Sequence, residues 1–204
     1  MTTPAGRRWG GEGAATDDEQ ARHKLLDAGE RCIAQRGDTQ IRMVEVADEA
    51  AVARSTLYRY YATRDDLLLA LVLRRIDRAA ARWVAGLRRP RDAAASIREL
   101  VLHPVTAVDG DPVNLALYSG DRGTLISVLD EGTDAITAVL AGHVGPLFTQ
   151  WKRDGQLHPD LDLRETMQWI SATTSFLLSS QWRHRAPSAH RRFVDRYLLR
   201  ALLV

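Results

Sequence analysis

The sequence predicts an all-α fold, and three observations support this. Apolar residues recur at spacings of three and four along most of the chain, beginning with Leu25, Leu26, Ala28, Gly29, Cys32 and Ile33. No stretch alternates apolar and polar residues as a half-buried strand would. Gly and Pro fall between the periodic segments, as at Gly37 and Pro90, where helices end.

The first ninety residues predict a flexible arm followed by four helices. Residues 1–16 have no periodicity and are expected to form the arm. A first helix is expected over 17–36, because acids at its start suit the helix dipole and Gly37 suits its end. Short helices are expected over 42–50 and 53–60. A long helix follows Thr63, which begins a capping-box pattern with the acids after it.

The rest of the chain predicts further helices separated by breaks. They are expected over 92–102, 113–118, 124–153, 163–182 and 188–203. His103-Pro104 and residues 109–112 are expected to interrupt the pattern, since Pro lacks the amide that a helix needs.

Composition and motifs exclude several kinds of protein. The chain has 204 residues and a single cysteine, Cys32, so neither an internal disulfide nor a Cys-rich zinc site is possible. The six histidines show no His-Glu-x-x-His spacing, and no nucleophile elbow, Walker A loop or dinucleotide fingerprint is present. We therefore expect no catalytic residue, metal or cofactor. No apolar run reaches about 18 residues and no secretory pattern is visible, which favours a cytoplasmic protein without a membrane partner.

The stretch from Val44 to Leu69 carries the most information. Its two short helices are joined by a very short turn, and Ala47 is small where crossing helices approach closely. If Val52, Leu57 and Tyr61 face inward, the second helix turns a polar face outward. That face holds Arg54, Ser55, Tyr58 and Arg59, with Thr56 and Tyr60 at its margins. Such a helix can both grip phosphate and reach base edges.

These residues resemble the DNA-binding module of the TetR family of bacterial transcriptional regulators. The matching segments are Val46-Ala47, Ala50-Ala51-Val52, Thr56-Leu57-Tyr58-Arg59-Tyr60-Tyr61 and Thr63-Arg64-Asp65-Asp66-Leu67-Leu68. The resemblance implies a helix-turn-helix domain over 17–64 and a helical sensor and dimerisation domain over 65–204. It also implies that Arg54 and Ser55 read bases, while Thr56, Tyr58, Arg59, Tyr60, Arg64 and Arg42 are DNA contacts, most of them to phosphate. For Tyr60, packing against the core is an equally good interpretation.

Three residues depart from the family pattern. Ala51 replaces the usual turn glycine, Ala53 replaces the usual serine N-cap, and Arg42 replaces a Thr or Ser at the start of the preceding helix. Each of the two alanines is expected to cost about 1 kcal/mol of stability. Neither removes the outward-facing polar helix.

The last two predicted helices are apolar on two sides, so each needs two partners. The family resemblance implies that one partner is the same pair of helices in a second subunit. The expected dimer residues are Trp169, Thr173, Phe176, Leu177, Ser180, Phe193, Tyr197 and Leu198. The resemblance also implies a pocket for a small-molecule effector. Candidate lining residues, most of which are more simply explained as plain core, are Trp83, His103, Tyr118, Phe148, Trp151, Met167 and Thr174.

Together these features predict a ligand-responsive regulator, a repressor that binds a palindromic DNA operator as a homodimer and is released by a small apolar effector. The alternative is an all-α DNA-binding regulator without a small-molecule ligand, controlled by a protein partner. The formal net charge is only +2, which predicts modest salt-driven affinity for DNA of any sequence. Specific binding would then depend more on dimer geometry and a few direct contacts.

Overall fold

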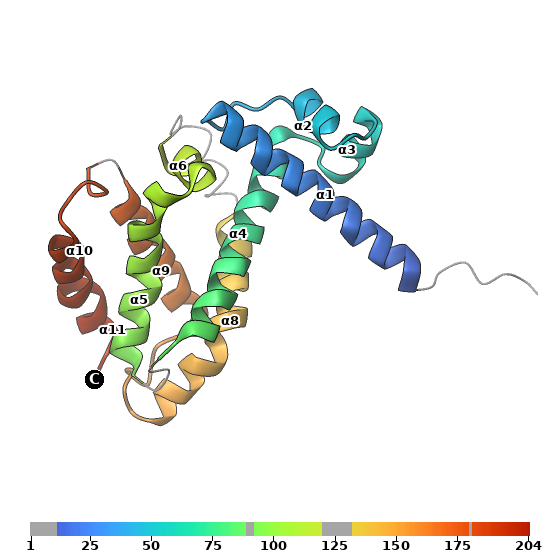
Figure 1. Cartoon of the computed structure of the whole chain (residues 1–204). Coiled ribbons are helices and arrows are strands. Elements are labelled where there is room, and N and C mark those ends of the chain that lie inside the picture. The colour runs from blue at the N-terminus through green and yellow to red at the C-terminus, as the bar shows by residue number, and fades with distance from the viewer. Residues whose placement is uncertain (1–11, 89–91, 120–131, 180) are drawn as a thin grey trace, which may run out of the picture.

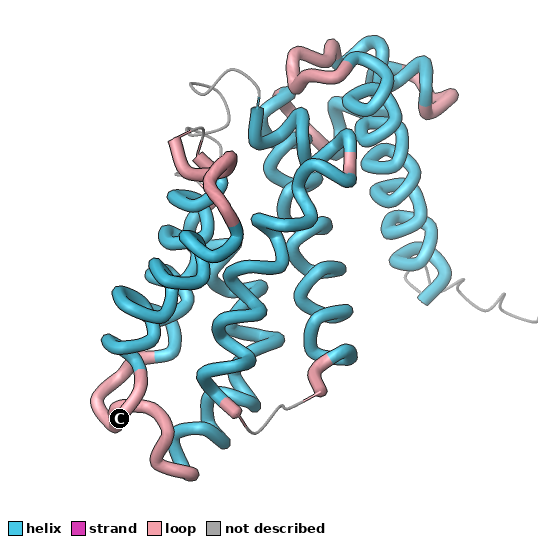
Figure 2. Tube along the Cα trace, turned by 60° about the vertical axis from the view of Figure 1, so that its left-hand side comes forward, coloured by secondary structure: helices cyan, strands magenta, loops and turns pink. Residues whose placement is uncertain are grey.

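A computed structural model describes residues 12–88, 92–119, 132–179 and 181–204, and within these ranges the regular elements are helices (Figures 1 and 2). The first four are α1 (Glu12–Arg36), α2 (Met43–Glu49), α3 (Arg54–Tyr60) and α4 (Arg64–Gly86). They are followed by α5 (Ala93–Ala107), η1 (Val108–Gly110), α6 (Pro112–Ser119) and α8 (Thr133–Arg153). The chain ends with α9 (Leu163–Leu178), α10 (Pro187–Phe193), the π-helical η2 (Val194–Leu199) and α11 (Arg200–Leu202). The predicted all-α class is confirmed.

Helices α1 to α3 form the N-terminal unit, at the upper right of Figure 1. The predicted apolar stripe of α1 is buried, Cys32 included, and burial raises the pKa of the Cys32 thiol. Gly37 ends α1 as predicted, with a left-handed φ of 79°. The predicted arm is wrong for its last residues, because α1 begins at Glu12 rather than at residue 17. Residues 1–11 of the arm lie outside the described residues.

Helix α4 connects this unit to the remaining helices. The predicted cap is confirmed: the Thr63 hydroxyl accepts from the Asp66 amide at 3.0 Å, and the Thr63 amide donates to the Asp66 carboxylate at 2.9 Å. Leu67 and Leu71 are buried against α1, where a side chain at Gly29 would begin only 3.2 Å from Leu71. The first turns of α4 therefore belong to the same core as α1.

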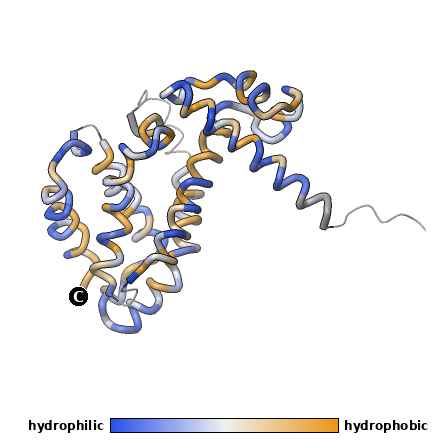
Figure 3. The backbone as a smooth tube through the Cα atoms, in the orientation of Figure 1, coloured by the Kyte–Doolittle hydropathy of each residue, from blue (hydrophilic) through white to orange (hydrophobic). Residues whose placement is uncertain are grey.

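The C-terminal helices pack into a bundle around the rest of α4 (Figure 1). Helix α8 lies between α4 and α9, while α5 contacts α9, α10 and η2. Figure 3 shows hydrophobic and hydrophilic positions interspersed along the helices of the bundle. The core is continuous from α1 to α11 through the described residues.

Some helix boundaries differ from those predicted. Helix α5 continues through Pro104 to Ala107, because a proline in the last turn leaves only one carbonyl without its helical partner. Helix α9 ends at Leu178, not 182, since Ser179 takes an extended conformation. The predicted last helix is divided by η2. The first residues predicted for the 124–153 helix lie outside the described part of the chain.

Two adjacent arginines tie α4 to both α1 and α6. Arg74, with a side chain only 7% exposed, contacts Asp27 at 2.7 Å and Glu30 at 2.9 Å on α1. Arg75 contacts Glu30 at 3.3 Å and Asp111 at 2.5 Å, just before α6. The chain of ion pairs thus joins the N-terminal unit to the C-terminal bundle at a second place besides the α4 backbone.

Candidate nucleic-acid interface

The short turn between α2 and α3 sets the angle at which α3 leaves the N-terminal unit. Ala47 is fully buried where the two helices cross, and its carbonyl accepts from the Val52 amide at 3.0 Å. Ala51 holds a left-handed φ of 51°, the one non-glycine positive φ among the described residues. Ala53 precedes α3 without a side-chain cap. Both alanines therefore occupy the turn and cap positions expected from the sequence.

Helix α3 has the predicted orientation. Leu57 is completely buried and Tyr61 is 7% exposed, and burial raises the pKa of the Tyr61 phenol. Four polar residues are exposed, namely Arg54, Ser55, Tyr58 and Arg59, while Thr56 and Tyr60 are half-buried at the margins. The helix thus presents a polar face to solvent, anchored by two apolar side chains.

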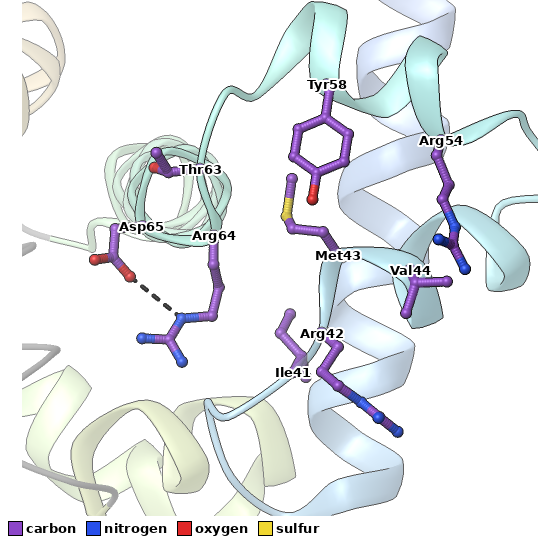
Figure 4. Close-up of a pocket in the computed structure, with 9 residues that line it drawn as sticks. All are labelled: Ile41, Arg42, Met43, Val44, Arg54, Tyr58, Thr63, Arg64 and Asp65. Carbon is purple, nitrogen blue, oxygen red and sulfur yellow. Dashed lines mark hydrogen bonds and ion pairs between the residues drawn. The ribbon is translucent and has the colours of Figure 1, made fainter.

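An open depression of about 540 Å³ lies beside this face (Figure 4). It is lined by Arg54 and Tyr58 from α3, by residues 41–44 at the start of α2, and by Thr63, Arg64 and Asp65 at the start of α4. Three arginines and one carboxylate give the lining a positive excess. Two helix N-termini, of α2 and α4, adjoin the depression, so its arginines and the helix dipoles both suit phosphate.

Arg42 and Arg64 already have carboxylate neighbours. The Arg42 guanidinium lies 2.6 Å from Glu45, and the Arg42 amide also donates to that carboxylate at 3.1 Å. Both contacts lower the pKa of Glu45, and the hydrogen bond from the Arg42 amide has the larger effect. Arg64 donates to Gln40 at 2.8 Å and lies 3.3 Å from Asp65. Since the Arg42 side chain is 73% exposed, it keeps donors facing solvent.

At the other end of α3, residues of α1 contact the predicted DNA-facing side chains. Arg59 donates to the Tyr60 hydroxyl at 3.0 Å, and the Arg22 guanidinium carbon lies 5.6 Å from the centre of the Tyr60 ring. Arg22 also lies 3.2 Å from the Asp18 carboxylate. Asp18, Arg22 and Gln40 were not predicted as residues of this region, because no local spacing relates α1, or the loop that follows it, to α3 and α4.

The predicted effector residues do not meet in a described cavity. Trp83, Phe148, Trp151 and Met167 are buried, and Thr174 is half-buried with its hydroxyl donating to the Ile170 carbonyl at 2.9 Å. His103 is exposed, because the buried face of α5 follows Ile97, Val101 and Val105 and leaves His103 on the opposite side. Its prediction as a pocket residue is wrong. The side chain of Tyr118 lies outside the described part of the structure.

The predicted dimer residues divide into three groups. Trp169, Phe176 and Tyr197 are 55%, 41% and 56% exposed, and Thr173 and Phe193 are half-buried. Leu177 and Leu198 are wrong predictions: both are at most 1% exposed within one chain. Leu177 follows Ile170 by seven residues and so shares its inward face, while Leu198 packs inward from η2. Ser180 lies outside the described residues.

The aromatic residues of this region form a continuous row. Phe193 lies 5.3 Å from Phe176, 4.8 Å from Trp182 and 5.0 Å from Tyr197, measured between ring centroids. We call Phe176, Phe193 and Tyr197 of this row, together with the exposed Trp169 on α9, the aromatic face. It spans α9, α10 and η2.

Two kinds of feature are absent from the described residues. None of the helices there has the length and apolar character needed to cross a membrane. No three or more His, Cys, Asp or Glu residues in the same ranges lie where they could hold a metal ion together.

A short, polar, outward-facing helix held by a tight turn against a second helix is a helix-turn-helix module. Joined to a separate helical bundle, it defines a helix-turn-helix transcriptional regulator. Comparison with known proteins identifies the family. Residues 25–71 match the model of the bacterial regulatory proteins of the tetR family. The N-terminal helices therefore form the helix-turn-helix domain of a TetR-family transcriptional regulator.

Relatives in sequence are regulators of the same kind. The chain is 27% identical over 134 residues to an uncharacterized HTH-type transcriptional regulator, Rv1255c, of Mycobacterium tuberculosis. That alignment spans 66% of each chain, slightly less than two thirds of the relative's length. The chain is also 24% identical over 153 residues to the fatty acid metabolism regulator protein of Bacillus subtilis, covering 74% of this chain and 77% of the relative.

Solved structures share the fold. The TetR family repressor AlkX of Dietzia sp., implicated in biodegradation of n-alkanes, superposes with a TM-score of 0.63 at 18% identity, covering 89% of this chain and 96% of that one. FadR of Bacillus subtilis, in complex with stearoyl-CoA, superposes with a TM-score of 0.55 at 19% identity, covering 88% and 98%.

Proposed function

We propose that this regulator is a repressor that binds a palindromic operator as a homodimer, through α3, and is released by a small apolar effector. The observation that carries the proposal is the exposed polar face of α3. This face lies beside a depression lined by Arg42, Arg54 and Arg64. Arg54 lies in the first turn of α3, the end of a recognition helix that reaches base edges. We assign base reading to Arg54 and Ser55, and phosphate contacts to Tyr58, Thr56, Arg42 and Arg64.

The base-reading role of Arg54 is tested by equilibrium binding to two duplexes, one selected from a random library and one of random sequence. Arg54→Ala should weaken binding to the selected duplex by about 5- to 150-fold, since a bidentate pair with guanine contributes about 1–3 kcal/mol. Binding to the random duplex should fall far less. Arg78→Ala is the matched control, because Arg78 is exposed on α4 away from α3. Equal losses on both duplexes would remove Arg54 as a base reader.

The dimer proposal rests on the aromatic face. Rings that are about half exposed in one chain and lie in a continuous row favour a partner surface over solvent. Two recognition helices are also needed, because one short helix contacts too few base pairs for useful specificity. Trp169→Asp should give a monomer by light scattering, whereas Leu115→Asp, at a 38% exposed site on α6, should leave a dimer. A wild-type monomer at micromolar concentration would contradict this part of the proposal.

The effector proposal rests on the apolar interior formed by Phe148, Trp151 and Met167. FadR is solved in complex with stearoyl-CoA and AlkX is implicated in biodegradation of n-alkanes, and both are consistent with an apolar ligand class here. The test adds n-alkanes, long-chain alcohols, fatty acids and stearoyl-CoA to the protein–operator complex. Release by an uncharged chain supports the proposal, and release only by the CoA ester would change the ligand class.

A regulator controlled by a protein partner is the second candidate. It is favoured by the burial of those same three side chains, which the depression beside α3 does not reach. Failure of every apolar compound to release the operator, together with release by a co-purifying protein, would favour it. Repression itself is tested by transcription of the target gene, which should rise when the regulator gene is deleted.

A further inference from the structure

Arg75 of α4 joins three helices through a single side chain. Its guanidinium lies 3.3 Å from Glu30 of α1 on one side and 2.5 Å from Asp111, just before α6, on the other. Its third nitrogen, Nε, donates to the side-chain oxygen of Asn114, in the first turn of α6, at 3.0 Å. We call Arg75, Glu30, Asp111 and Asn114 the Arg75 bridge. It lies where the C-terminal half of α1 passes beside α6 (Figure 1).

The α6 end of the Arg75 bridge is held in place by the C-terminal bundle. One Asp111 oxygen accepts from the Val113 and Asn114 amides, at 2.9 Å and 3.0 Å, and so caps α6. The other Asp111 oxygen accepts from Arg75. Because Val113 and Leu117 are buried in the core, α6 cannot shift freely. Asp111 and Asn114 are therefore fixed points to which Arg75 is attached.

The other end of the bridge belongs to the N-terminal unit. Glu30 lies close to Arg75 with one carboxylate oxygen and, at 2.9 Å, to Arg74 with the other. The next residue of α1, Arg31, lies 2.5 Å from Glu49, the last residue of α2. The short turn then attaches α3 to α2. A displacement of α1 relative to α6 therefore displaces α3 as well.

Burial and geometry make the Arg75 bridge stronger than a surface ion pair. The side chains of Arg75 and Glu30 are only 18% and 21% exposed, so water screens their contact less than it would at the surface. All three guanidinium nitrogens of Arg75 have a partner, which suits the planar fork of arginine. Both acids also keep other partners, Arg74 for Glu30 and two backbone amides for Asp111. Loss of Arg75 therefore leaves no buried carboxylate unpaired, and a variant should fold.

We propose that Arg75 determines which half-site spacing the dimer accepts, by fixing the N-terminal unit to the bundle at a second place besides the α4 backbone. This inference rests on the proposed binding of a palindromic operator by a homodimer. The bundle carries the proposed dimer interface, so the distance between the two α3 helices depends on how each N-terminal unit is held on its bundle. With α4 as the sole connection, the unit can tilt and one dimer fits several spacings. With the bridge in place, a tilt breaks the contacts of Arg75 with α1 or with α6, so one spacing is favoured.

The test compares binding to the operator selected from a random library with binding to a derivative that has one base pair inserted between the half-sites. The insertion moves one half-site by about 3.4 Å and rotates it by about 35°. It should weaken wild-type binding by about 100-fold, toward the non-specific level. Arg75→Met should make this spacing penalty about tenfold smaller, within the usual range of coupling between two sites. Glu30→Gln, which removes the charge at the α1 end of the bridge, should reduce the penalty in the same way.

Arg78→Met is the matched control, because Arg78 is exposed on the same helix and lies outside the bridge. It should keep the wild-type penalty, and circular dichroism verifies that each variant folds. A purely structural role of Arg75 would weaken binding to both duplexes by the same factor and leave the penalty unchanged, which would overturn the inference. An equal decrease with Arg78→Met, or a wild type that binds both spacings alike, would overturn it too. Failure of the wild type to select any inverted repeat would instead overturn the proposed operator binding.

Discussion

Ala51 stores backbone strain in the turn between α2 and α3, and Ala51→Gly should release it. Its φ of 51° lies in the left-handed region, which costs an L-residue with a side chain about 1–2 kcal/mol. The methyl group is exposed, so its removal sacrifices little apolar burial. Glycine loses about 0.4–1 kcal/mol through its greater freedom in the unfolded chain. The net increase in the free energy of unfolding is therefore about 0.5–1 kcal/mol.

Urea denaturation followed by circular dichroism measures this increase, with an unchanged m value showing that the same surface unfolds. Ala81→Gly is the matched control. Ala81 is exposed inside α4, where the same substitution should cost about 1 kcal/mol because glycine is a poor helix former. The free energy of unfolding should therefore rise with Ala51→Gly and fall with Ala81→Gly. A loss of stability for Ala51→Gly comparable to that of Ala81→Gly would refute the strain in the turn.

Three further substitutions test other parts of the structure. Ala53→Ser should add about 1 kcal/mol to the free energy of unfolding by supplying the missing cap of α3, and unchanged denaturation curves would exclude a capping role. Arg74→Met should lower the free energy of unfolding by about 2 kcal/mol. A fully buried pair would cost more, but Asp27 is 51% exposed and screened by water. An unchanged midpoint of urea denaturation would contradict this. Partial burial raises the pKa of Asp111, but the Asn114 and Val113 amides and Arg75 outweigh it and hold the pKa below its ordinary value. The ionised Asp111 should therefore contribute its full stabilisation above about pH 4, and this should be lost as the pH falls through the lowered pKa of the folded state. Asp111→Asn should abolish this pH dependence of stability.

The N-terminal unit could be predicted because its signals are local. The spacing of Leu57 and Tyr61 fixes which face of α3 is buried, and Thr63 with Asp66 marks the start of α4 within four residues. The family pattern also indicated the position of the left-handed residue, because Ala51 replaces the usual turn glycine.

Features that depend on distant contacts were not predictable in the same way. Leu177 and Leu198 lie on helices that are apolar on two sides, so periodicity alone does not distinguish the intrachain face from the aromatic face. Pro104 was predicted to end α5, but a proline in the last turn interrupts few hydrogen bonds. The contact of Arg22 with the Tyr60 ring joins residues 38 positions apart, and no sequence spacing indicates it.

Selection of duplexes from a random-sequence library by the wild-type protein tests the central claim most directly. If two copies of α3 read DNA from a symmetric dimer, the enriched sequences should contain an inverted repeat whose half-sites are centred about one helical turn apart, or a multiple of it. Substitution of Arg54 by Ala should remove the enrichment at a guanine within each half-site. Enrichment of no sequence by the wild type, or of the same inverted repeat by both proteins, would contradict the assignment of α3 and Arg54 as the reading surface.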